Sequence, residues 1–364
     1  MTRELCALLT NAAAPCPDAA RVPPLVALAR THRVHLVAAY QLARRAPMAV
    51  SGDLRAEMRV EALRDTLRRR ELARVAAALE GDGCDPVVFK GAALALTHYA
   101  DSWLRPRLDA DILVAPAARE RAASVLGALG YTRPAMTAGR LVMHQEMHVR
   151  PDATVGEHVV DLHWRVANPN LLAGLPSHGE LRARATRTVA DGVPVAVASP
   201  PDALVISCVH RVAHHGGSSE LLWLLDISLL ARRLSADEWR MAVDVARTAQ
   251  VAALVQRGLE LGECAFASPV PPDVARDLRQ AALVPEPSAV FLREDLRPVD
   301  RLRADVAALG AARGARLVAE HLFPPASYMR QKYQLRSDVL LPLAYARRIV
   351  GGATGWFRKQ RGPV

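Results

Sequence analysis

Two aspartates stand two positions apart in the apolar stretch LDADILV, residues 108–114. This composition is typical of a β-strand, and side chains at i and i+2 point to the same face of a strand. Asp109 and Asp111 would therefore present their carboxylates side by side, and two like charges at such a distance favour a cation between them, most simply a divalent metal ion. A strand end with two solvated aspartates is the alternative, but aspartate is depleted inside strands.

A third carboxylate occurs in the stretch HVVDLHWRV, residues 158–166, which also has strand composition. Alternation places Asp161 and His163 on one face of this strand. If the strand lies beside the one that carries Asp109 and Asp111, three acids converge, and this is the ligand set of a two-metal phosphoryl-transfer site. For Asp161 taken alone, an ion pair with an arginine on a neighbouring strand is the alternative.

Lys90 and Gly91 interrupt the chain between the apolar run VVF, residues 87–89, and a stretch of helical composition, residues 92–99. Lysine is rare here, since 44 of the 47 basic residues are arginines. A lysine ammonium is a compact point charge that suits a single phosphate or a tight site better than a guanidinium does. The lysine at this strand-to-helix turn is therefore a candidate phosphate ligand.

Three histidines cluster near a predicted helix end, at His210, His214 and His215, with Cys208 close by. Histidines at i and i+4 can share a zinc ion, but the sequence places no third ligand. Packing and capping around the glycines at 216–217, or lining of a substrate pocket, are the other interpretations. All three stay open.

Asp226 lies in the strongly apolar predicted helix LLWLLDISLL, residues 221–230. A buried acid needs a partner. We therefore expect a contact with an arginine or a histidine, in a structural role rather than a catalytic one.

The helices and strands that carry these residues are predicted from the periodicity of apolar positions along the chain. Residues 3–80 are predicted to be helical, and they end in one long helix at 52–80, whose Arg/Glu-rich side is expected to be a solvated face. A helix at 116–130 and a hairpin of strands at 143–150 and 158–166 follow. From residue 201 the chain is again mostly helical, with helices at 202–213, 219–234 and 236–261. We expect three parts: a helical N-terminal part at 1–80, a catalytic core at 81–200 and a helical C-terminal part at 201–364.

Composition limits the class of protein. Half of the 364 residues are apolar, which is typical of a globular chain. The net charge of +10 permits nucleic-acid binding, but the arginine excess is consistent with codon bias, so this partner is not favoured. Five scattered cysteines fit a reducing cytoplasm. We expect no signal peptide and no membrane span. The segment 351–364 is expected to be a frayed end, with contact to an anionic surface as the alternative.

Several of these motifs resemble the signature of the bacterial uncharacterised nucleotidyltransferase family, in the DNA polymerase β-like superfamily. They are Lys90-Gly91, the arginine at 105 followed by DADILV at 109–114, and VDLHW at 160–164. The likeness continues in HHG at 214–216, LWLLDI at 222–227 and LFPP at 322–325. It spans roughly residues 50–350.

This resemblance implies an α+β fold, with a small mixed sheet flanked by helices and helical N- and C-terminal parts. It implies a phosphoryl-transfer enzyme that moves an NMP group from an NTP, such as ATP, to an acceptor hydroxyl and releases pyrophosphate. The acceptor would be a small molecule, a peptide or a protein. Two Mg²⁺ ions, or Mn²⁺, would be held by the three acids, Asp109, Asp111 and Asp161. The nucleotide would be bound by a second set of residues: Lys90, Gly91, Arg105, His163 and His214.

Two other functions stay open. The first is a toxin-like nucleotidyltransferase that modifies tRNA ends, which the positive net charge of the chain permits. The second is a catalytically degenerate nucleotide-binding or scaffold protein. It is favoured by Ala92, which follows Gly91 where the superfamily usually has glycine or serine, and by the long spacing of eighteen residues between Gly91 and Asp109.

Overall fold

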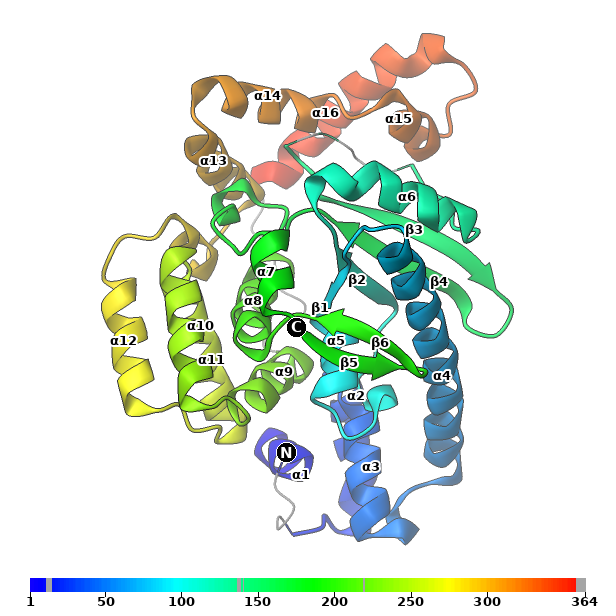
Figure 1. Ribbon diagram of the computed structural model, residues 1–364, viewed down its shortest axis with the longest axis vertical. Helices are drawn as coiled ribbons and strands as arrows, with labels where there is room; N and C mark the ends of the chain where they lie inside the picture. Colours follow the sequence, from blue (N-terminus) through cyan, green and yellow to red (C-terminus); the bar gives the residue numbers. More distant parts are fainter. Residues whose placement is uncertain (11–14, 136–138, 140, 219, 358–364) are drawn as a thin grey trace.

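The computed structural model describes residues 1–10, 15–135, 139, 141–218 and 220–357, with the backbone alone for 353–357. The chain begins with four α-helices, of which the last is the long one predicted from the sequence (Figure 1): α1 (Thr2–Thr10), α2 (Val22–Thr31), α3 (His35–Arg45) and α4 (Gly52–Gly81). Ser51 caps α4 by accepting a hydrogen bond from the backbone N–H of Leu54 at 3.2 Å. The helical N-terminal prediction is confirmed for the residues described. The segment 358–364 of the predicted frayed end lies outside them.

A six-stranded mixed sheet forms the centre of the molecule, in the order β3-β4-β2-β1-β6-β5. Its strands are β1 (Val87–Phe89), β2 (Asp109–Leu113), β3 (Gln145–Asp152), β4 (Gly156–His163), β5 (Thr186–Ala190) and β6 (Val193–Val197). The pairs β2/β4 and β1/β6 are parallel, and the pairs β1/β2, β3/β4 and β5/β6 are antiparallel. The predicted mixed sheet is confirmed, and the predicted hairpin of 143–150 and 158–166 is β3/β4.

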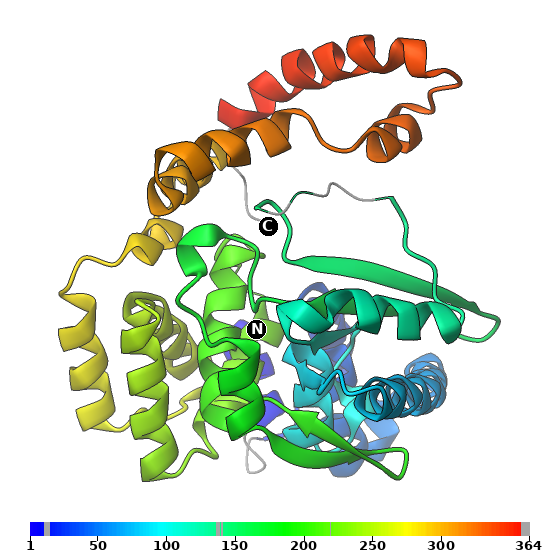
Figure 2. The same ribbon diagram turned by 45° about the horizontal axis from the view of Figure 1, so that its top comes forward.

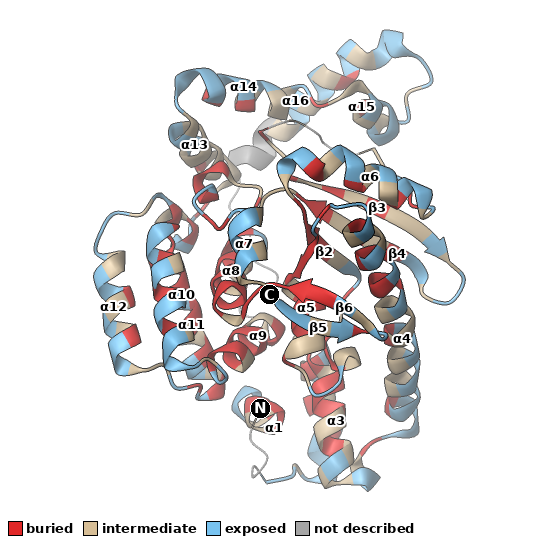
Figure 3. Ribbon diagram, in the orientation of Figure 1, coloured by how far each residue is buried: buried red, intermediate tan, exposed pale blue. Residues whose placement is uncertain are grey.

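Helices cover both faces of this sheet (Figures 1 and 3). One face packs against α4 and α6 (Arg119–Ala128), through a buried cluster that includes Val88, Ile112 and Val160. The other face packs against α8 (Pro200–Ala213), and Phe89 and Leu113 belong to that cluster. Strand alternation therefore directs Asp111, two residues before Leu113, towards the α8 side of the sheet. The short helices α5 (Lys90–Thr97) and α7 (His178–Arg184) complete this region.

The rest of the chain is helical, as predicted. The helices after α8 are α9 (Leu221–Ala231), α10 (Ala236–Thr248), α11 (Ala252–Phe266), α12 (Pro272–Ala282), α13 (Pro298–Leu309), α14 (Ala311–Leu322), α15 (Ala326–Tyr333) and α16 (Leu341–Phe357). Helix α9 shares a buried cluster with α1, α2 and α3, so the N-terminal helices pack on the first helices of the C-terminal part. Figure 2 shows α14, α15 and α16 projecting from the main body, to which the backbone N–H of Leu141 joins α14 by donating a hydrogen bond to Glu320 at 2.8 Å. We call residues 311–357 the C-terminal arm. Among the described residues, no helix has the length and apolar character needed to cross a membrane.

One helix prediction differs from the structure. The sequence predicts a single helix over 236–261, but the chain forms α10 and α11, separated at Ala249, Gln250 and Val251. Gln250 adopts a left-handed backbone with φ of 55°. The carboxylate of Glu286 accepts hydrogen bonds from the first backbone N–H groups of α11, at 2.8 and 2.9 Å. A cap supplied from 33 or more residues away leaves no local sequence signal, so periodicity alone could not find this break.

Candidate active site

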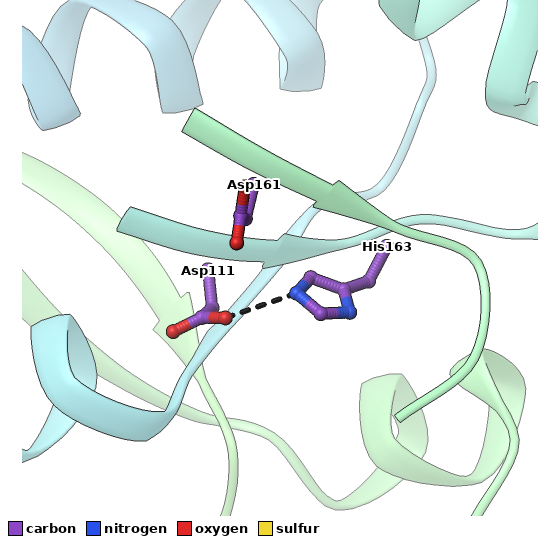
Figure 4. Close-up of side chains that lie close together, drawn as sticks. All are labelled: Asp111, Asp161 and His163. Carbon is purple, nitrogen blue, oxygen red and sulfur yellow. Dashed lines mark hydrogen bonds and ion pairs between the residues drawn. The ribbon is translucent and has the colours of Figure 1, made fainter. Parts of the chain in front are cut away.

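The acids of β2 and β4 lie side by side because the two strands pair in parallel with Asp111 opposite Asp161. Strand alternation adds His163, two residues further along β4, on the same face. One ligand atom from each of Asp111, Asp161 and His163 lies within 4.8 Å of the others, and Figure 4 shows the three side chains converging. Asp109 precedes them on β2 and is exposed. The condition for convergence of the three acids, that the two strands are neighbours in the sheet, is met.

Lys90 approaches this cluster from the first position of α5. Its ammonium Nζ lies 2.7 Å from Oδ1 of Asp111, and Nε2 of His163 lies 2.9 Å from the same oxygen. Burial alone would raise the pKa of Asp111, but Lys90 and His163 outweigh burial and hold that pKa far below its usual range. Lys90 has a left-handed φ of 51°, a conformation uncommon for residues other than glycine. The turn that aims its side chain at Asp111 is therefore built at Lys90 itself.

Asp161 has a different environment from Asp111. Burial, followed by the charges of Asp111 and Asp109, raises the pKa of Asp161 to about 6. The side-chain amide of Gln145 donates a hydrogen bond to Oδ2 of Asp161 at 3.1 Å, and Asn168 donates to the amide oxygen of Gln145 at 3.1 Å. Sequence reasoning missed both amides. The signal for Gln145 was its place on the neighbouring strand, because pairing of β3 with β4 puts it opposite His163.

Arg105 and Asp226 form a buried ion pair at the base of the site. Nη2 of Arg105 lies 2.7 Å and Nε 3.0 Å from the two carboxylate oxygens, and both side chains are about 95 % buried. The hydroxyl of Tyr99 donates a hydrogen bond to the same carboxylate at 2.7 Å. The expectation that Asp226 contacts an arginine is confirmed. Because Asp226 accepts from Nε and from one N–H of Nη2, a phosphate contact by Arg105 would use Nη1 or the second N–H of Nη2.

Position 91 needs glycine because the guanidinium of Arg105 leaves no room for a Cβ atom, and not because the backbone there is left-handed. A Cβ atom added to Gly91 would lie 2.4 Å from Nη1 of Arg105, which is held in place by Asp226. Nη1 of Arg105 therefore rests directly against the Lys90–Gly91 turn.

Substituting Gly91 with alanine is expected to destabilise the fold by about 1–3 kcal/mol, because the new methyl group must displace a buried, paired guanidinium. Chemical denaturation measures this. The matched control is Gly127→Ala in α6, where no heavy atom lies within 4 Å of an added Cβ; there alanine should be neutral or stabilising. Equal effects of the two substitutions would show that Arg105 does not confine Gly91.

Helix α4 anchors the loop that leads into β2. Arg107 of this loop pairs with the buried Asp65 of α4 at 2.6 Å. Glu71, six residues further along α4, is also buried and pairs with Arg150 of β3 at 2.8 Å. The expectation that the charged side of α4 is solvated is therefore wrong for these two acids, which bind the helix to the loop before β2 and to the edge strand.

The acids open onto a cleft of about 430 Å³ between the sheet and helices α8 and α9. The opposite wall carries aromatic rings. His215 stacks on Trp223 with ring centroids 4.2 Å apart, and the exposed His214 stacks on His210 at 4.9 Å. Nε2 of His210 and Nε2 of His215 lie 3.0 Å apart. In the part of the chain that the structure describes, these histidines do not join a group of three candidate metal ligands, and they line the cleft.

The model of the uncharacterised nucleotidyltransferase family matches residues 18–267. This match covers more than half of the chain and contains every acid of the cluster. The protein belongs to this family. It is accordingly a transferase of the nucleotidyl-transfer class, and a nucleotide is its implied substrate, as the motifs predicted. A search of curated proteins finds no match for the chain.

Seven predicted site residues of this nucleotidyltransferase line the one cleft: Lys90, Gly91, Arg105, Asp109, Asp111, Asp161 and His214. His163 is 1 % exposed and supports Asp111 from behind. Ala92, the departure from the superfamily turn, packs in the hydrophobic core with Val88. Its side chain does not line the cleft, so a serine hydroxyl at this position would face the core instead.

Proposed function

We propose that this nucleotidyltransferase moves an NMP group from an NTP to an acceptor hydroxyl in a Mg²⁺-dependent reaction that releases pyrophosphate. The observation that carries the proposal is the meeting of Asp111, Asp161 and His163 ligand atoms within 4.8 Å. This cluster lies on a cleft large enough for a small ligand, in a chain that belongs to a nucleotidyltransferase family.

The donor set fits a hard divalent cation. Carboxylate oxygens are the ligands that Mg²⁺ and Mn²⁺ prefer. Burial, followed by the charges of Asp111 and Asp109, raises the pKa of Asp161, and a bound cation would offset these two charges. Asp109, Asp111 and Asp161 would hold the metal, in the two-ion arrangement that the family resemblance implies. When bound, the metal would polarise the phosphoryl group as a Lewis acid and would lower the pKa of the acceptor hydroxyl.

The other cleft residues take roles that follow from their positions. Lys90 and Nη1 of Arg105 lie at the same turn, where two cations would balance the charge of a triphosphate. On the opposite wall the exposed ring of His214, stacked on His210 on one side, offers its other face to a nucleobase. Asp161 is ionised above pH 6, and as a carboxylate beside the metal ion it would accept the proton of the acceptor hydroxyl.

The raised pKa of Asp161 leads to a testable pH dependence. Above pH 6 the carboxylate is ionised and can hold a metal ion, and below pH 6 a proton competes for it. The affinity for Mn²⁺ is therefore expected to fall by about tenfold per pH unit below pH 6, since one proton is exchanged. Electron paramagnetic resonance of free Mn²⁺ between pH 5 and 7 measures this. The variant Asp161→Asn should bind weakly with a flatter profile; an unchanged profile would remove Asp161 from the metal site.

A transfer assay tests the reaction itself. The full chain would be incubated with each of the four NTPs labelled at the α-phosphate, with Mg²⁺, and with a small-molecule extract or a protein extract as the source of hydroxyl acceptors. We expect labelled product and an equal amount of pyrophosphate with one or more NTPs, and neither after chelation of the metal. Release of inorganic phosphate in place of pyrophosphate would contradict the proposed bond cleavage, because nucleotidyl transfer breaks the α–β linkage.

A further inference from the structure

The positive charge of this protein is concentrated in one part of the sequence. Residues 311–364 contain ten arginines or lysines and two acids, so they carry +8 of the net charge of +10. The other 310 residues are nearly neutral. The C-terminal arm lies within this basic segment and outside the residues that match the nucleotidyltransferase family, which end at 267. The segment therefore has a chemical character of its own.

The arm also exposes large apolar side chains. Val339, Leu343 and Val350 are 84, 68 and 74 % exposed. Leu343 and Val350 stand seven residues apart on α16, so they share one face of that helix. Arg347 lies between them and is exposed as well. The arm is coloured mainly as exposed or intermediate in Figure 3. A helix face that combines apolar and basic residues is the pattern of an interfacial helix.

These apolar side chains are not exposed because the arm lacks a packed interior of its own. The inward faces of the arm are packed, with Leu317, Met329 and Ala344 buried. The hydroxyl of Tyr345 donates a hydrogen bond to the backbone carbonyl of Pro324 at 2.6 Å, which closes α16 onto the loop before α15. The outward apolar residues are therefore additional to those that hold the arm together.

The chemistry of the face favours one kind of partner. A second copy of the chain would bring two strongly positive arms together, which Coulomb repulsion opposes. Single-stranded RNA is bound by stacking successive bases on several open aromatic rings. In the described part of the arm Phe323 is exposed, but basic side chains lie over the rings of Tyr328 and Tyr333 at 5.5–5.7 Å. Aliphatic side chains beside arginines instead match the acyl chains and phosphates of an anionic bilayer.

We propose that the C-terminal arm binds the surface of anionic lipid membranes. Leu343, Val350 and Val339 enter the boundary between headgroups and acyl chains, and Arg336 and Arg347 contact lipid phosphates. This binding places the enzyme at a membrane without a spanning helix. It does not depend on the proposed transfer reaction, and its tests need no nucleotide.

Cosedimentation of the full chain with lipid vesicles tests the proposal. We expect binding to vesicles of phosphatidylcholine with about one third phosphatidylglycerol to be at least about tenfold tighter than to pure phosphatidylcholine, and to weaken with salt. The variant Leu343→Asp/Val350→Asp should lose this binding. The matched control is Leu283→Asp/Val284→Asp, which changes two exposed apolar residues of the main body and should bind as wild type does.

A second variant, Arg336→Ser/Arg347→Ser, keeps the test independent of any folding defect caused by the aspartates. It should lower binding to the anionic vesicles and leave the thermal unfolding midpoint unchanged within a few degrees. Binding that ignores phosphatidylglycerol, or that falls equally in the control variant, would overturn the proposal. A labelled oligoribonucleotide is measured in parallel: if the arm variants weaken RNA binding and leave vesicle binding unchanged, the partner is RNA and not a membrane.

Discussion

Replacing Asp161 with asparagine is expected to lower the rate of nucleotidyl transfer by about 10²–10⁴-fold, the range typical for loss of a general base. Asparagine keeps the size of the side chain and can still accept the hydrogen bond from Gln145. It cannot take up a proton at neutral pH, and it adds no charge to the metal site. The expected loss therefore appears in kcat as well as in the dependence on Mg²⁺, when the rate of label transfer is measured at saturating NTP.

The matched control for this experiment is Asp152→Asn, at the last residue of β3, where the turn to β4 begins. Asp152 accepts hydrogen bonds from the backbone N–H groups of Thr154 and Val155 at 2.9 and 3.0 Å, and asparagine supports the same turn. This variant tests the effect of removing a carboxylate from the same hairpin away from the cleft, and it should keep the wild-type rate. If Asp161→Asn transferred label as fast as Asp152→Asn, Asp161 would have no role in the reaction.

Asp226→Asn is expected to give the largest loss of stability, about 3–5 kcal/mol in the free energy of unfolding. The reason is that Arg105 would be left charged and buried without its counter-ion. The buried hydroxyl of Tyr99 would also lose its charged acceptor. Since Nη1 of Arg105 lies against Gly91, the same variant should weaken NTP binding under conditions where it is still folded.

Denaturation with urea measures this loss against a surface pair. The control is Asp295→Asn, whose partner Arg293 lies 3.0 Å away but is about half exposed, so its loss should leave the stability close to that of the wild type. An effect of Asp226→Asn as small as that of the control would mean that solvent reaches Arg105, and that the base of the cleft is not the rigid, buried pair described above.

The acids of the site could be predicted from the sequence because strand alternation is a local property. An aspartate in an apolar strand is visible from its neighbours, and the spacing of Asp109 and Asp111 fixes their common face. That β2 and β4 are neighbours in the sheet could not be predicted and could only be assumed. It depends on a parallel pairing between segments fifty residues apart, which no local pattern encodes. The resemblance of VDLHW to a family motif supplied what periodicity could not.

Other features of the site depend on contacts that the sequence does not display. The left-handed backbone of Lys90 and the amides of Gln145 and Asn168 are fixed by packing around Asp111 and Asp161. The Arg/Glu-rich composition of α4 predicts a solvated face, because such helices usually expose their charged side. Asp65 is nevertheless buried, because Arg107 of the loop before β2 pairs with it. These features depend on tertiary contacts, which can override the conformation or exposure that the local sequence favours.

Calorimetric titration of each NTP into the protein, with and without Mg²⁺, tests the claim that the acids of β2 and β4 form a metal-dependent nucleotide site. We predict that the wild-type chain binds at least one NTP with Mg²⁺ and binds none after chelation. The variant Asp109→Asn/Asp111→Asn, checked for folding by its thermal unfolding, should bind none in either condition. Equal binding by both proteins, or binding that persists in excess chelator, would contradict the claim.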